Sequence, residues 1–69
     1  MKLDLHGKRH YEVPILVENF IYLNQDQVPL TIICGNSQRM IDIVNGVIEE
    51  IDCAIVAMDQ YGKIVIRKI

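Results

Sequence analysis

An apolar run from Leu30 to Cys34 lies between two segments whose apolar residues recur at helical spacing. A continuous run of this length is typical of a strand buried inside a parallel sheet. Parallel strands need a long crossover connection, which a helix usually supplies. Because crossovers are right-handed, both flanking helices are expected to cover the same face of the sheet. This run therefore predicts a two-layer α/β domain.

The two helical segments can be bounded from their sequence. The first runs from about Tyr11 to Asn24, and Pro14 is tolerated in its first turn, where amides lack partners within the helix. The second follows a glycine turn and runs to about Ile51, with Asn36 or Ser37 as its N-cap. Gly46, inside the second helix, is expected to permit close packing against the first.

Three further segments have strand character: Lys2 to Leu5, Cys53 to Met58 and Lys63 to Lys68. The residues between the last two, Asp59-Gln60-Tyr61-Gly62, are a hairpin signal. The predicted order is βαβαββ, a four-stranded mixed sheet with two helices on one face, in a single domain over residues 1–69. The other face of the sheet would be open to solvent or to partners.

Composition supports a small folded domain. The chain has 69 residues and is 51% hydrophobic, which is enough for a core and argues against disorder. No apolar run approaches the roughly 20 residues that cross a bilayer, and no signal peptide is recognisable, so no membrane association is expected. Cys34 and Cys53 are too few for a disulfide framework or a zinc site and are expected to behave as small hydrophobes in a reducing, cytoplasmic compartment.

The charge distribution is uneven. A net charge of -2 counts against a general polyanion binder, which needs clustered Lys and Arg. The run Lys8-Arg9-His10 is nevertheless locally basic. Because the local field matters more than the sum, nucleic acid stays a candidate partner.

Asp4 and His6 are the first candidate chemical pair. Two positions apart in a strand, they share one side, opposite Leu3 and Leu5. A carboxylate beside an imidazole at a strand end can prepare a proton-transferring group. The plainer interpretation is that the two residues only cap loops or hydrogen-bond each other.

The predicted topology would bring two glycine loops together. The carboxyl ends of adjacent parallel strands meet at one edge of the sheet, where ligands bind in open α/β folds. Each loop leads into a helix N-terminus, which favours anions. The candidate residues at this edge are His6, Gly7, Lys8, Arg9 and His10 from the first loop, Gly35, Asn36 and Ser37 from the second, and Arg39 from the second helix.

With both loops in view, the chain resembles the Smr (small MutS-related) domain family. Leu3-Asp4-Leu5-His6-Gly7 matches that family's opening LDLHG signature. Ile32 to Ser37 is similar to its second motif, commonly written HGxG or TGxG. Here Cys34 stands where His or Thr is usual, Asn36 where Lys is frequent, and Ser37 where the second glycine belongs.

The resemblance implies the βαβαββ fold, similar to the C-terminal domain of translation initiation factor three. It also implies work on RNA or DNA, since Smr domains include DNA-nicking and RNA-cleaving endonucleases, some of which act at stalled ribosomes. Asp4 and His6 fall on the family's functional Asp-x-His, and Gly35 on the loop glycine that faces nucleic acid. Such a minimal domain looks like versions carried by phages, for which the compartment would be the host cytoplasm.

Three functions follow as hypotheses. The first is an endonuclease in which His6 acts as general acid or base, Asp4 orients its ring, and Lys8, Arg9, Arg39 and the amides of Gly35 to Ser37 stabilise the phosphorane. No carboxylate cluster accompanies Asp4, so two-metal catalysis is not expected, and no metal ligand or cofactor is assigned. The second is a non-catalytic module that binds nucleic acid or the ribosome, which the acidic balance and the altered second motif favour.

The third hypothesis is a small assembly protein. Tyr61 to Ile69 is expected to form an edge strand, through which the chain could pair with a second copy by sheet extension. The expected oligomeric state is a monomer or a weak homodimer.

Overall fold

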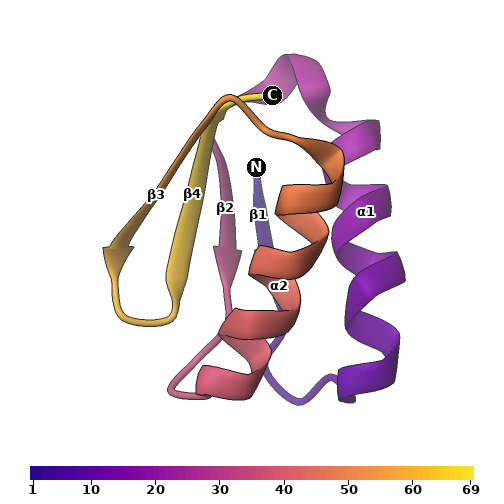
Figure 1. Ribbon diagram of the computed structural model, residues 1–69, viewed down its shortest axis with the longest axis vertical. Coiled ribbons are helices and arrows are strands. Elements are labelled where there is room, and N and C mark those ends of the chain that lie inside the picture. The colour runs from indigo at the N-terminus through magenta and orange to yellow at the C-terminus, as the bar shows by residue number, and fades with distance from the viewer.

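Four strands form one mixed sheet in the computed structural model, which describes residues 1–69 (Figure 1). They are β1 (Lys2–Asp4), β2 (Leu30–Ile33), β3 (Ile55–Gln60) and β4 (Lys63–Lys68), in the spatial order β1-β2-β4-β3. β1 runs parallel to β2, whereas β4 is antiparallel to both β2 and β3. The predicted mixed sheet is confirmed.

Two helices pack on one face of this sheet, and the other face carries none (Figure 1). They are α1 (Val13–Leu23) and α2 (Gln38–Ile51), and the element order is the predicted βαβαββ. Short 3-10 helices, η1 (His10–Glu12) and η2 (Gln25–Gln27), precede and follow α1. Neither α1 nor α2 has the length and apolar character needed to cross a membrane.

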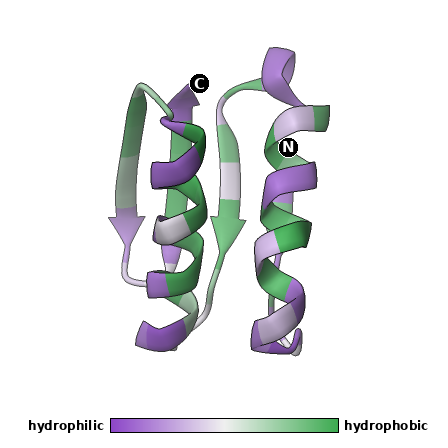
Figure 2. Ribbon diagram, turned by 45° about the vertical axis from the view of Figure 1, so that its right-hand side comes forward, coloured by the Kyte–Doolittle hydropathy of each residue, from purple (hydrophilic) through white to green (hydrophobic).

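The central strands, β2 and β4, contribute buried aliphatic side chains to the hydrophobic core. Leu30 lies opposite Ile66 and Ile32 opposite Ile64, and each of the four is at most 1% exposed. Burying a side chain of this size contributes about 1.5–3 kcal/mol. The helices cover these strands with Val13, Val17 and Ile21 of α1 and with Met40, Ile41, Val44, Val47 and Ile48 of α2. Figure 2 shows the result: β2 is largely green, and both helices carry green and purple bands, as amphipathic helices do.

Local signals fix both ends of α2. The Ser37 hydroxyl accepts a hydrogen bond from the Met40 amide at 3.2 Å, so Ser37, and not Asn36, is the N-cap. The helix closes at Asp52, which adopts a left-handed conformation with φ 65°. The expectation for Gly46 is wrong, because a Cβ at this position would meet nothing within 4 Å.

The expected edge strand is also wrong. β4 lies between β2 and β3 and is hydrogen-bonded on both sides, because the hairpin returns it against β2. The sheet's edges are β1 and β3. Every residue of β3 is exposed, including Ile55, Val56 and Met58.

Both cysteines are free, and both pack in or against the hydrophobic core. Cys34 is 4% exposed within the core, and Cys53 is partly buried against it, as the sequence predicts for small hydrophobes. Burial raises the pKa of the Cys34 thiol. Burial, together with the nearby Asp52 carboxylate, raises the pKa of Cys53. Both thiols are therefore held in their protonated, less reactive form.

Candidate functional site

The two glycine loops leave the same edge of the sheet. β1 and β2 end in register, with Asp4 opposite Ile33, and the Leu5 amide extends the ladder by donating to the Ile33 carbonyl at 2.9 Å. Both strands end at the bottom of Figure 1, where the loops to α1 and α2 begin. The edge on which the sequence places its candidate residues therefore exists.

In the first loop, Asp4 shapes the backbone. Its carboxylate accepts a hydrogen bond from the His6 amide at 2.9 Å, and the Lys8 amide donates to the Leu5 carbonyl at 3.0 Å. Gly7, with φ 80°, supplies the left-handed conformation of this turn. The His6 side chain is exposed, and no hydrogen bond joins its ring to Asp4. The Asp4 carboxylate thus stabilises the backbone of the loop that carries His6. The endonuclease hypothesis instead expects Asp4 to orient the His6 ring.

The second loop is held by the β3–β4 turn. The Cys34 amide donates to the Gly62 carbonyl at 2.6 Å, and the Tyr61 hydroxyl donates to Gln38 Oε1 at 3.0 Å. Gly62 is buried, and a Cβ there would overlap the carbonyl oxygen of Gly35 and lie 2.9 Å from its carbonyl carbon. Only glycine therefore fits at position 62. The turn between β3 and β4 therefore packs against the loop that precedes α2 and holds it through these two hydrogen bonds.

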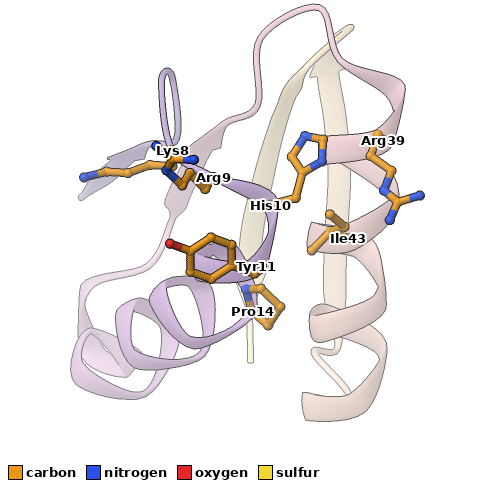
Figure 3. Close-up of a pocket in the computed structure, with 7 residues that line it drawn as sticks. All are labelled: Lys8, Arg9, His10, Tyr11, Pro14, Arg39 and Ile43. Carbon is orange, nitrogen blue, oxygen red and sulfur yellow. The ribbon is translucent and has the colours of Figure 1, made fainter.

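A groove opens where the first loop meets the N-terminal half of α2 (Figure 3). It has a volume of about 620 Å³ and is called the basic groove below. Its lining residues are Lys8, Arg9, His10, Tyr11, Pro14, Arg39 and Ile43.

The basic groove is positively charged although the chain is acidic overall. Lys8, Arg9 and Arg39 each bring a positive charge, and no carboxylate lines the groove. The protein's one ion pair joins Arg67 to Asp59 at 3.8 Å, so the groove cations have no carboxylate within salt-bridge distance. Two carboxylates lie beside this loop and are engaged with its backbone: Asp4 accepts from the His6 amide, and Glu12 accepts from the Arg9 amide at 3.0 Å. Unpaired cations from separate elements can hold a polyanion.

The apolar part of the basic groove comes from Tyr11, Pro14 and Ile43. The Tyr11 ring is 79% exposed, and its hydroxyl makes no hydrogen bond within the protein. In Figure 3 the Tyr11 ring lies close to Pro14, the His10 ring extends from the same segment toward α2, and Arg39 comes from α2 itself. The groove therefore combines an aromatic face with cationic groups.

The structure gathers some predicted site residues and separates others. Lys8, Arg9, His10 and Arg39 meet in the basic groove. The others belong to the two loops at the same sheet edge but do not line the groove; they are Asp4, His6, Gly7, Gly35, Asn36 and Ser37. Ser37 is occupied as the N-cap of α2.

Sequence reasoning missed Tyr11, Pro14 and Ile43 as lining residues, because the first two were assigned to the first helix and Ile43 lies within the second. The available signal for Tyr11 was its position directly after the basic run. No group of three or more His, Cys, Asp or Glu side chains is placed to hold a metal ion.

Comparison with protein-family models, with curated proteins and with solved structures found no match to this chain. The function must therefore be argued from the motifs and from the geometry of the groove.

Proposed function

We propose that this protein is a nucleic-acid-binding domain of the Smr type, which holds the phosphate backbone in the basic groove. The observation that carries the proposal is the meeting of Lys8, Arg9 and His10 with Arg39, which are distant in sequence, without any carboxylate among them. Phosphate contacts from Lys and Arg supply most of the affinity of sequence-independent binding. The LDLHG signature beside the groove supports the same conclusion.

The acidic remainder of the chain limits where binding can occur. With a net charge of -2, the protein repels polyanions at a distance, so attraction is confined to the groove. Each neutralised phosphate contributes about -0.7 to -0.9 to the slope of log affinity against log salt. The three groove cations, Lys8, Arg9 and Arg39, therefore give an expected slope of about -2 to -3.

Charge reversal tests this proposal. Lys8→Glu with Arg9→Glu should abolish most binding of a labelled oligonucleotide in fluorescence anisotropy and should flatten the salt slope. The matched control is Lys2→Glu with Lys68→Glu, which makes the same change of charge at exposed sheet positions outside the groove. Equal losses in the two double variants would show that only net charge matters and would refute the groove as the binding site. Competition by a mononucleotide as strong as that by the oligonucleotide would instead indicate a small phosphorylated ligand.

A second candidate function is endonuclease activity, favoured by the state of His6. Its imidazole is exposed, makes no hydrogen bond to Asp4, and lies two residues before Lys8, the one lysine of the groove. A proton acceptor there could act on a ribose hydroxyl, or a proton donor on the leaving oxygen. Lys8, Arg9 and Arg39 would stabilise the charge that develops on the phosphorane.

The assay for cleavage uses end-labelled RNA and supercoiled plasmid with the wild-type protein and His6→Ala. Loss of cleavage with retained binding in His6→Ala supports this role. Cleavage that survives the substitution would exclude His6 as the proton-transferring group, and wild-type protein that binds without cleaving would leave the binding function alone.

A further inference from the structure

Tyr11 is the one tyrosine in the basic groove, and its environment distinguishes it from the other exposed tyrosines. Tyr61 donates its hydroxyl to Gln38, and Tyr22 lies on α1 outside the groove. Tyr11 has neither a hydrogen-bond partner nor apolar cover, since 79% of it is exposed. It follows directly after Lys8, Arg9 and His10, so its ring lies beside the groups that would hold phosphates.

We propose that the Tyr11 ring stacks on an unpaired base, and that the basic groove therefore selects single-stranded over duplex nucleic acid. The inference rests on the proposed binding function and adds the class of ligand to it. A base offers its π-face to a side chain only when it is unstacked, which single strands allow and duplexes resist. Cations beside an aromatic platform are the usual means of binding single strands without reading their sequence.

The surroundings of the ring suit this role. Pro14 and Ile43 give the groove an apolar surface that a base can cover. Arg39 lies across the groove on α2, and the His10 ring extends from η1 toward that helix (Figure 3), so both can contact the phosphates that flank the stacked nucleotide. Tyr11 belongs to η1, whose first turn is closed by the Glu12 amide donating to the Arg9 carbonyl at 3.0 Å, so the backbone that carries the ring is held in place.

Binding of short oligothymidylate, short oligouridylate and a DNA duplex of equal length tests the inference by fluorescence anisotropy. The wild-type protein should prefer both single strands to the duplex. Tyr11→Ala should weaken single-strand binding by about 5- to 150-fold, the range for loss of one stacked base. Tyr11→Phe keeps the aromatic face and should stay close to wild type. Tyr22→Ala, which removes an exposed ring outside the groove, is the matched control and should have no effect.

Tyrosine emission gives an independent readout, because the chain contains 3 Tyr and no Trp. Stacking on a base should quench part of this emission in the wild type, and the quenching should be absent in Tyr11→Phe although that variant still binds. Circular dichroism of each variant verifies that the fold is retained.

The outcomes separate the two proposals. Equal affinity for duplex and single strands, or unchanged binding by Tyr11→Ala, overturns the stacking inference; if Lys8→Glu with Arg9→Glu still abolishes binding, the proposed function stands. Wild-type protein that binds none of the three probes overturns both.

Discussion

Replacing Gly62 by Ala tests how firmly the β3–β4 turn is packed against the loop before α2. Gly62 has φ 84°, and its missing side chain leaves room for the Gly35 carbonyl. An alanine must therefore adopt an unfavourable conformation and also displace backbone atoms, which have little freedom to move. Displacement would lengthen the hydrogen bond from the Cys34 amide to the Gly62 carbonyl.

The expected loss can be assembled from its parts. The left-handed conformation costs an L-residue about 1–2 kcal/mol. Weakening a backbone hydrogen bond adds about 0.5–1.5 kcal/mol, and the backbone overlap adds to this. The lower entropy of the unfolded alanine chain offsets only about 0.4–1 kcal/mol of this loss. A reduction of about 2–4 kcal/mol in the free energy of unfolding is a large share for so small a domain.

Urea unfolding followed by far-UV circular dichroism measures this loss. The control is Gly7→Ala, because Gly7 has a similar φ of 80° but a Cβ there would meet nothing within 4 Å. Gly7→Ala should cost only the conformational part, about 1–2 kcal/mol. If both variants lose the same free energy, the turn does not brace the Gly35 loop and the packing argument fails.

Three further predictions concern stability. Ser37→Ala should lower the free energy of unfolding by about 1 kcal/mol, because it removes the acceptor for the Met40 amide; Asn36→Ala is the control, and equal losses in urea titrations would contradict the assignment of the cap. Gly46→Ala should raise the thermal midpoint, since alanine gains about 0.5–1 kcal/mol in a helix and has open space here; a lower midpoint would show hidden crowding. Burial raises the pKa of Cys34, so the unfolded chain loses its thiol proton first as pH rises. Stability due to this group is complete below the ordinary thiol pKa of about 8.5 and is lost above it. The urea midpoint of Cys34→Ala should therefore fall less steeply with alkaline pH than that of the wild type, and parallel curves would refute the linkage.

Hydrophobic patterning was sufficient to predict most of the fold. β4 begins and ends where the apolar run from Lys63 to Lys68 predicts, and β2 ends one residue before the expected Cys34. The third strand is displaced, running over Ile55–Gln60, and not Cys53 to Met58. The strand begins later than expected because the residues after the left-handed Asp52 connect α2 to the sheet. It ends later because the hairpin turn contains only Tyr61 and Gly62. Periodicity detects an element but not the length of the connection that leads to it.

For the candidate site, the sequence predicted the features that follow from the order of the strands and helices, but not the side chains that line the groove. Parallel β1 and β2 place both glycine loops at one edge, and this follows from the sequence order alone. That Tyr11 lines the groove depends on the short η1 turn before α1, which helical periodicity does not reveal. The contact between Gly62 and Gly35 joins residues far apart in the chain, and no local pattern marks it.

The contact between Gly62 and Gly35 ties the loop before α2 to a hairpin that is synthesised after it. During synthesis both glycine loops and both helices are made before the hairpin, yet the loop ahead of α2 is fastened by Gly62 and Tyr61. A nascent chain that still lacks β4 has all its groove side chains but not the support that sets their spacing. The loop ahead of α2 is therefore fully supported only when β4 lies between β2 and β3.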